Sequence, residues 1–481
     1  MLAFVALAAW AFASPVGAGP DDDYHLVSVW CAGGGSDLCV PGSSDDVRRV
    51  PAGFESLICY VTDAEQSAAC QADAMPRVDG PWVETARGNF VGEYPPVYYA
   101  TMRLFAGHDV EFSALVMRLV NAALFVLMST AVAALVPQRR RVLVWAWLIT
   151  LVPLGMFLIP SNNPSGWAIT GVGTAFLAMV GWYEAEGWRR WAAAGVFALA
   201  VVMAAGARGD AAVYVVGAAV TATIVSWRPA RGWWSLALPL AAAAAGLVAA
   251  FAAGQSNVAG GFSSTPVGPD GVPVGGGSEP GLALAAYNLL MVPHLWTGVF
   301  GTWALGWFDT LMPAVVPWAV AGAFIAVGFA GLGLMTWRKA VSLAGVVGVL
   351  VLLPVYVLTM GGHEVGENLQ PRYLLPVIVL LGFLLVWETP GAKLHFTRLQ
   401  TLVIVGALGT AHMVALQVNL RRYVTGVDLQ GPNLDAGAEW WWSGVPWGPG
   451  LTWVVGTVAY AGVLAVAWGV LRDGTLRARD E

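Results

Sequence analysis

Long apolar runs recur along the whole chain, and they constrain the fold more than any other feature. A helix needs about 20 apolar residues to cross a hydrocarbon core. We expect helices at 2–13, 113–136, 142–160, 166–183, 191–206, 211–227, 233–253, 312–336, 341–360, 373–388, 399–417 and 451–471. Only 11% of the 481 residues are charged, whereas a soluble domain carries about 25%. The sequence therefore predicts an all-α polytopic membrane protein with about 12 transmembrane helices.

Lysines and arginines mark alternate loops between these runs. Cytoplasmic loops hold the excess of cations. The cation-bearing loops contain residues 139–141, 189–190, 228 and 231, 338–339, 393 and 398, and 472, 477 and 479. We expect these loops on the inner face of the plasma membrane, with both termini cytoplasmic and 472–481 as a tail. The net charge of −6 gives no indication of nucleic-acid binding.

The first run is short for a membrane crossing. Ala11-Phe12-Ala13 before Ser14 has the small-residue spacing of a signal-peptide cleavage site, but no basic region precedes it. We expect residues 1–13 to be the first transmembrane helix, with a cleaved signal-like segment as the alternative. Both interpretations place the following segment, 14–112, outside the membrane.

All four cysteines lie in this first outer loop, at Cys31, Cys39, Cys59 and Cys70. An even number of cysteines confined to one outer loop indicates disulfide bonds in an oxidising compartment. Three connectivities exist, and we expect the two local pairs, Cys31–Cys39 and Cys59–Cys70. A zinc site is disfavoured because the loop has no CxxC pair.

Two further outer segments separate the predicted helices. The first, 254–311, falls between helices 2–7, in 113–253, and helices 8–12, in 312–471. Residues 254–280 are rich in Gly, Ser and Pro and should be mobile. Residues 282–307 are apolar and rich in Trp, and we expect an interfacial helix or a re-entrant piece. The second outer segment is 418–450.

An acidic motif follows the first apolar run, where the chain emerges outside. It reads Pro20-Asp21-Asp22-Asp23-Tyr24-His25. Neighbouring carboxylates raise one another's pKa, and a carboxylate tuned in this way can accept a proton from a hydroxyl. A solvated acidic cap is the alternative. No cofactor is expected, although such a cluster can also bind a divalent metal.

Two more polar motifs precede later helices, and Arg208 joins them on the same predicted face. Tyr94, Tyr98 and Tyr99 lie in Tyr94-Pro95-Pro96-Val97-Tyr98-Tyr99 and can pack on sugar rings, or form an interfacial belt. Arg372 and Tyr373 begin a late helix, nine residues after His363 and eight after Glu364. A guanidinium there suits a phosphate, unless it pairs with Glu364 or Glu367. Arg208 should pair with Asp210.

In this order and spacing, the three motifs resemble the bacterial membrane family called domain of unknown function 2142, whose members are similar to GT-C glycosyltransferases. The resemblance rests on Pro20 to His25, on Tyr94 to Tyr99 and on Gln370-Pro371-Arg372-Tyr373-Leu374-Leu375-Pro376, and so covers most of the chain. It implies transfer of a sugar, on the outer face, from a polyprenyl-phosphate donor to a cell-wall glycan, glycolipid or glycoprotein.

The resemblance also implies roles for individual residues. The general base maps to Asp22, then to Asp21 and then to Asp23. Arg372 would neutralise the departing lipid phosphate, and His25 would orient a carboxylate or contact the phosphate. The alternatives are a transporter or flippase of a lipid-linked or anionic precursor, and a non-catalytic envelope assembly factor. Transporters place polar groups near the midplane, whereas the motifs here cluster at one face.

Overall fold

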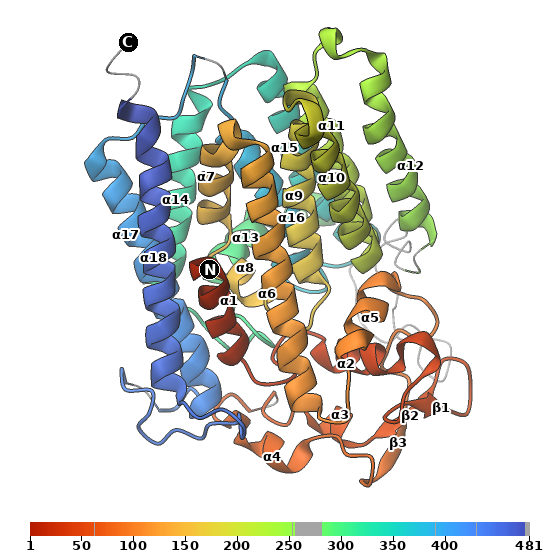
Figure 1. Ribbon diagram of the computed structural model, residues 1–481. Helices are drawn as coiled ribbons and strands as arrows, with labels where there is room; N and C mark the ends of the chain where they lie inside the picture. Colours follow the sequence, from red (N-terminus) through yellow and green to blue (C-terminus); the bar gives the residue numbers. More distant parts are fainter. Residues whose placement is uncertain (62, 253, 255–280, 390, 430, 477–481) are drawn as a thin grey trace.

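Long helices run side by side through most of the molecule (Figure 1). The computed structural model describes all residues except 62, 253, 255–280, 390, 430 and 477–481. Almost all of the predicted Gly/Ser/Pro-rich stretch therefore lies outside the described residues, as does the end of the predicted tail.

Nine helical segments in the described part of the chain are long and apolar enough to cross a membrane. They are Val110–Leu135 (α6), Gly187–Ala207 (α10), Gly209–Ser226 (α11), Trp233–Ala250 (η6, Trp233–Leu236, with α12, Ala237–Ala252), Leu282–Thr302 (α13, Leu282–Thr297, with η8, Gly298–Thr302), Val315–Leu332 (α14), Trp337–Met360 (α15), Arg398–Val424 (α17) and Pro449–Leu471 (in α18, Pro449–Leu476). Leu2–Phe12 (α1) and Pro371–Leu385 (α16) are shorter apolar helices. The polytopic helical architecture is confirmed, whereas the expected total of 12 is not established.

One predicted span is interrupted. Residues 142–160 form α7 (Arg140–Thr150) and the short α8 (Leu154–Leu158) instead of one continuous helix. Pro153 lies between them, and proline cannot donate the backbone hydrogen bond that a continuing helix needs. The next helix, α9 (Ser165–Glu184), is buried at every residue from 165 to 183. It packs against α6, α10, α11 and α16 and forms the centre of the bundle.

The segment α13–η8 enters the bundle and returns to the same side. Asn288 donates to the carbonyl of His363, just beyond the end of α15, at 3.0 Å. Eight residues later, Trp296 donates to the carbonyl of Leu350, in the interior of α15, at 3.1 Å. The chain then returns to the first loop, where Trp307 donates to the carbonyl of Gly17 at 2.8 Å. These contacts fit the re-entrant piece expected for 282–307.

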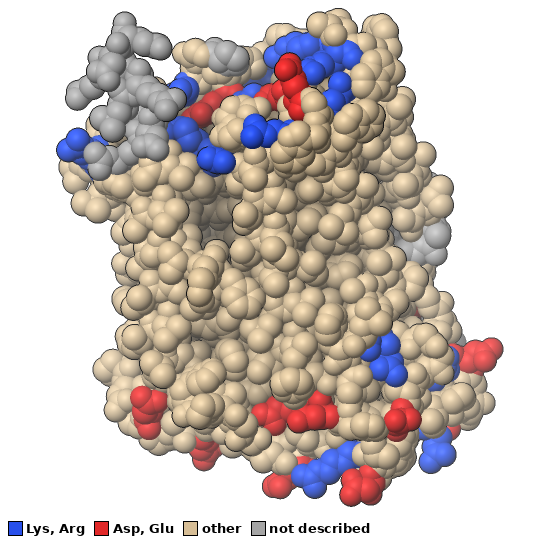
Figure 2. Space-filling model, in the orientation of Figure 1, with Lys and Arg blue, Asp and Glu red and all other residues tan. Residues whose placement is uncertain are grey.

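The cation-bearing loops meet at one end of the bundle. Arg139 pairs with Glu184, the last residue of α9, Arg338 donates to the carbonyl of Trp227, and Lys339 donates to the carbonyl of Leu385. Figure 2 shows charged residues at both ends of the visible face and an uncharged band between them. This band has the polarity of a surface that faces lipid.

The first loop is a small folded unit at the opposite end of the bundle (Figure 1). Its helices are α2 (Asp22–Cys31), α3 (Gly53–Ser56), α4 (Gln71–Ala74) and α5 (Val97–Met102). Its strands β1 (Val40–Pro41), β2 (Arg48–Pro51) and β3 (Trp82–Thr85) form an antiparallel sheet in the order β1-β2-β3. The all-α expectation is therefore wrong for this loop. Disulfides join Cys31 to Cys39 and Cys59 to Cys70, which confirms both predicted pairs.

The remaining described elements are short 3₁₀ turns. They are η1 (Ala32–Gly34), η2 (Ala68–Cys70), η3 (Arg103–Phe105), η4 (Pro137–Arg139) and η5 (Pro229–Arg231).

Helix α1 lies against the half of α18 that is nearer the first loop (Figure 1). A Cβ on Gly462, midway along α18, would be 3.0 Å from Leu2, and Trp442, which precedes α18, donates to the carbonyl of Phe12. Residue 1 therefore lies partway along the bundle, whereas α18 runs to the cation-rich end. The sidedness of both termini stays a prediction.

Cysteine labelling tests this sidedness. Because all four native cysteines are bonded, single cysteines can be introduced into the native chain. We expect Asp37→Cys to react with a membrane-impermeant maleimide on intact cells, and Arg140→Cys to react only after permeabilisation. The reverse pattern would show that the first loop is cytoplasmic.

Candidate functional site

The first and third sequence motifs meet through an ion pair. Arg372 lies in the first turn of α16 and is 4% exposed. Its guanidinium donates to the Asp21 carboxylate and, at 2.9 Å, to the carbonyl of Pro20, 352 residues away in the sequence. The sequence predicted that the two motifs share a site. It did not predict this partner, because Glu364 and Glu367 were the carboxylates considered for Arg372.

Arg87 supplies a second cation to the acidic motif. It donates to both carboxylate oxygens of Asp23 and forms a 3.2 Å contact with Asp21. Its side chain is 50% exposed, so this contact lies at the solvent edge of the cluster. The sequence analysis missed Arg87, which belongs to none of the three motifs. Only the folding of the loop brings it beside them.

The motif from Tyr94 to Tyr99 packs against His25. The ring Nδ1 of His25 lies 2.9 Å from the Tyr99 hydroxyl, and the Tyr94 ring meets the imidazole edge-on. Tyr24 donates to Glu93 at 2.8 Å. Burial lowers the pKa of His25 to about 3, so its imidazole is neutral at physiological pH. A neutral imidazole can exchange hydrogen bonds with a substrate but cannot neutralise a phosphate.

Arg208 lies beside Tyr94 and Tyr373, and its guanidinium already donates hydrogen bonds to Asp210. It forms a bidentate pair with Asp210 at 2.9 and 2.8 Å, as expected. Its guanidinium lies 4.6 Å from the centre of the Tyr373 ring and 5.8 Å from that of Tyr94. It therefore contributes positive charge beside the site and holds two of the aromatic residues predicted to bind substrate.

Two of the predicted substrate-binding residues lie apart from this cluster. His363 contacts Glu367 at 3.2 Å, and the backbone N–H of Glu364 donates to the same Glu367 carboxylate. In the described structure, these contacts close the turn after α15. The hydrogen bond of His363 is thus local to this turn.

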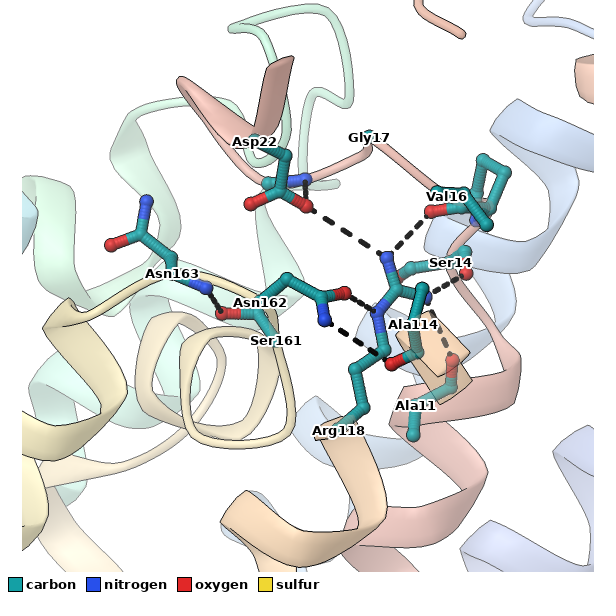
Figure 3. A network of polar contacts seen from close by, with 12 residues as sticks. Ala11, Ser14, Val16, Gly17, Asp22, Ala114, Arg118, Ser161, Asn162 and Asn163 are labelled. Carbon is teal, nitrogen blue, oxygen red and sulfur yellow. Dashed lines mark hydrogen bonds and ion pairs between the residues drawn. The ribbon is translucent and has the colours of Figure 1, made fainter. Parts of the chain in front are cut away.

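Asp22 points away from the ion-paired cluster into a buried network (Figure 3). It is 0% exposed, and its Oδ2 accepts the Gly19 N–H at 3.0 Å. The same oxygen lies 3.8 Å from the Arg118 guanidinium of α6. A Cβ on Gly19 would come 2.5 Å from the Asp22 carboxylate, so this position requires glycine. Oδ1 of Asp22 is buried without a hydrogen-bond partner among the described residues.

Arg118 is the centre of this network. It is 1% exposed and donates to the side-chain oxygen of Asn162 at 2.7 Å. It also donates to three backbone carbonyls, that of Ala11 in the last turn of α1 and those of Ser14 and Pro15 just after it, at 3.2, 2.5 and 2.7 Å. The sequence showed Arg118 inside a predicted span and Asn162 in a polar turn, but did not indicate that they meet.

The two leading carboxylates have opposite pKa shifts. Burial raises the pKa of Asp22 to about 6, because its partial contact with Arg118 does not offset desolvation. Burial also acts to raise the pKa of Asp21, but the charge and hydrogen bond of Arg372 outweigh it and hold that pKa below its usual value. Asp21 is therefore ionised over the whole physiological range, whereas Asp22 titrates near pH 6.

A narrow pocket opens beside Arg372. Pro20, Phe157, Leu158, Gly298, Trp303 and Gln370 are among the residues that line it. The Arg372 Nε, the Trp303 indole N–H and the Gln370 side-chain oxygen are buried and have no partner within the described chain. The pocket holds about 20 Å³ in this conformation, so it must widen to admit more than a water-sized group. Two unused N–H donors in an apolar setting suit an anion.

The acidic motif does not form a metal site in this conformation. Among the residues that the structure describes, no three His, Cys, Asp or Glu side chains converge as metal ligands. Asp21 and Asp23 both face arginines, whose charge would compete with a cation.

A family model described as "Predicted membrane protein (DUF2142)" matches residues 4–381. The chain belongs to this family. All three DUF2142 motifs of the site, from Pro20 to Pro376, fall inside the matched range. No curated protein and no solved structure matches the chain.

The Arg118 network predicts a large stability difference between two arginines of this DUF2142 protein. Arg118→Met should lower the free energy of unfolding by about 3–5 kcal/mol, because it leaves Asp22 and several carbonyls buried without partners. Arg87→Ala, at a half-exposed pair, should cost less than about 1 kcal/mol. Thermal unfolding of both purified variants in detergent measures the difference. Equal melting temperatures would contradict the structural role of Arg118.

Proposed function

We propose that this protein is a membrane glycosyltransferase of GT-C type. It would move a sugar from a polyprenyl-phosphate donor to a cell-envelope acceptor on the outer face. The observation that carries the proposal is the contact between Arg372 and Asp21. It joins a phosphate-binding group and a proton acceptor beside a pocket with unused N–H donors. Glycosyl transfer from a lipid phosphate needs this combination.

The depth of Arg372 suits a donor held in the bilayer. Helix α15 has 24 residues and its neighbour α16 has 15. Both reach the cation-rich end, where Lys339 donates to the carbonyl of Leu385. At about 1.5 Å per residue, α16 stops roughly 13 Å short of the outer end of α15. Arg372 therefore lies below the outer loops, at a level that a lipid-anchored phosphate reaches from the side.

Burial favours Asp21 over Asp22 as the general base. A base must come within hydrogen-bond distance of the acceptor hydroxyl. The Asp22 side chain is 0% exposed and lies in the Arg118 network, whereas the Asp21 side chain is 35% exposed. We therefore assign proton transfer to Asp21, and to Asp22 the role of holding the loop. This reverses the order that the family resemblance implied.

The proposed reaction is a single displacement. The acceptor oxygen attacks the anomeric carbon, the bond from that carbon to the phosphate oxygen breaks, and the hydroxyl proton passes to Asp21. The polyprenyl phosphate leaves with the bonding electron pair, and Arg372 neutralises it. The configuration at the anomeric carbon is inverted. His25, neutral and bonded to Tyr99, holds the tyrosine wall over the carboxylate.

Asparagine substitutions at Asp21 and Asp23 test whether Asp21 is the general base. Asp21→Asn should reduce transfer of radiolabelled sugar from a polyprenyl-phosphate donor by roughly 100- to 10,000-fold, the contribution of general-base catalysis. Asp23→Asn, whose side chain only meets Arg87, is the matched control and should stay near full activity. Full activity of Asp21→Asn would show that Asp21 is not the base. Movement of the lipid-linked donor between leaflets without its consumption would favour a transporter.

The pH dependence identifies the base independently. If Asp21 is the base, kcat/KM should stay level between pH 7 and pH 5, because the free enzyme already holds Asp21 ionised. If Asp22 is the base, kcat/KM should fall about tenfold per pH unit below about pH 6, as its carboxylate becomes protonated. Initial rates at low donor concentration give this profile.

Arg372 should act on donor binding. Arg372→Ala should raise the donor KM by roughly 10- to 150-fold, because a charge-assisted hydrogen bond contributes about 1.5–3 kcal/mol. Arg372→Lys should recover only part of this affinity, because an ammonium lacks the planar fork. Arg77→Ala, an exposed cation in the same outer loop, controls for net charge. An unchanged KM in Arg372→Ala would place the phosphate elsewhere.

A further inference from the structure

A second pocket lies beside Tyr99, whose hydroxyl contacts His25. It is bounded by α2, η1, β2, α5 and the loop after β3, which Figure 1 shows together in the first-loop unit. Its volume is about 240 Å³, enough for one sugar ring. We call it the α2–α5 pocket. Its walls include Ser28, Gly34, Arg48, Asn89, Phe90 and Tyr99.

The walls of the α2–α5 pocket are fixed by covalent and polar contacts. Gly33, Gly34 and Gly35 all have positive φ, at 71°, 101° and 115°, and the Cys31–Cys39 disulfide closes the loop that contains them. A Cβ on Gly33 or Gly34 would meet no described atom within 4 Å, so this wall is low and open. Asn89 bonds the backbone N–H and carbonyl of Tyr94, at 2.8 and 2.9 Å. The cavity is therefore preformed.

The lining combines an aromatic face with neutral polar groups. Phe90 presents its ring and carries the Arg48 guanidinium 5.2 Å from the ring centre. One Arg48 nitrogen already donates to the carbonyls of Asp45 and Val47. No carboxylate lines the cavity. An aromatic surface with a few oriented polar groups recognises a neutral ring that carries hydroxyls, which has both an apolar face and polar edges.

Tyr99 joins this pocket to the proposed reaction centre. Its ring lines the cavity, and its hydroxyl lies 2.9 Å from Nδ1 of His25. The backbone N–H of His25 in turn donates to the carbonyl of Asp21 at 2.9 Å. The chain from Pro20 to Ser28, which includes Asp21, thus connects two pockets. The one beside Arg372 suits an anion on an apolar chain, and the α2–α5 pocket suits an uncharged ring.

We infer that the α2–α5 pocket binds a neutral sugar ring of the acceptor, which makes the acceptor a glycan. That the bound ring belongs to the acceptor rests on the proposed function. That the pocket binds a carbohydrate rests on the pocket alone. It narrows the acceptor to a glycan chain, free or carried on a lipid or protein, and makes Phe90 and Tyr99 its binding residues. The ring would be held next to Tyr99, at the C-terminal end of α2.

Binding of simple glycosides to the purified full-length protein tests this site without any donor. The probes are the methyl glycosides of mannopyranose, glucopyranose, galactopyranose and arabinofuranose, observed one at a time by saturation-transfer difference NMR. We expect saturation of the ring protons of at least one probe. Ala100→Trp should abolish it, because this exposed residue of α5 lines the cavity and tryptophan would fill it. Phe90→Ala should weaken it by about 2- to 10-fold through loss of the aromatic face.

Two controls separate this inference from the proposed function. Phe112→Ala, which removes a 64% exposed phenylalanine of α6, should leave glycoside binding unchanged. Arg372→Ala should also leave it unchanged while donor affinity falls. If no probe binds the native protein, or if Ala100→Trp binds as the native protein does, the pocket assignment is wrong even where sugar transfer is intact. If the protein binds glycosides in this pocket but consumes no lipid-linked sugar, the pocket assignment stands and the proposed transferase function is wrong.

Discussion

The buried guanidinium of Arg118 is the interaction on which the site depends. A charge inside a membrane bundle costs several kcal/mol unless its donors are satisfied. Arg118 meets this cost with Asn162, the carbonyls at and just after the end of α1, and the Asp22 carboxylate. These partners come from three separate parts of the chain. Because all of them contact the Arg118 side chain, the position of the chain at the end of α1 is fixed. The position at which the acidic motif begins is fixed with it.

From this anchor, the three consecutive aspartates acquire different environments. Asp21 immediately precedes α2, and Asp22 and Asp23 lie in its first turn, where successive side chains point about 100° apart around the axis. Asp22 turns into the Arg118 network, Asp23 turns to Arg87, and Asp21 faces Arg372. Asp21 also has a left-handed backbone, with φ of 60°, which is uncommon for a residue other than glycine. The paired surroundings hold it in that conformation.

Much of the fold could be predicted from the sequence because apolar periodicity and cation placement report directly on the bilayer. The disulfide pairs followed from the cysteine spacing, whereas the interfacial or re-entrant placement of 282–307 stays a prediction. The helix break at Pro153 could not be predicted from the presence of the proline, because prolines also occur within continuous helices, such as Pro354 in α15.

The candidate site was predictable to the level of its motifs and no further. Order along the chain indicated that Asp21 and Arg372 share one face, and the structure brings them into contact. The roles of Arg87 and Arg118 could not be predicted, because no sequence spacing relates Arg87 to α2 or Arg118 to the turn before α9. Burial, which separates Asp21 from Asp22, depends on tertiary packing that two adjacent identical residues cannot reveal.

The ion pair between Arg372 and Asp21 suggests an order of substrate binding for the proposed reaction, with the donor before the acceptor. With no donor bound, the guanidinium that should hold the phosphate is occupied by the carboxylate that should accept the proton. This pairing lowers the basicity of Asp21, so an acceptor that arrived first would meet a weak base. A lipid phosphate that entered beside Trp303 would offer Arg372 a second anion, with oxygens placed for bidentate hydrogen bonds. If Arg372 turned to it, Asp21 would keep its contact with Arg87 but lose that with Arg372, and its basicity would rise. Under the proposed mechanism the base would thus be strengthened when the sugar to be transferred is in place, and the narrow pocket would have to widen to admit the phosphate.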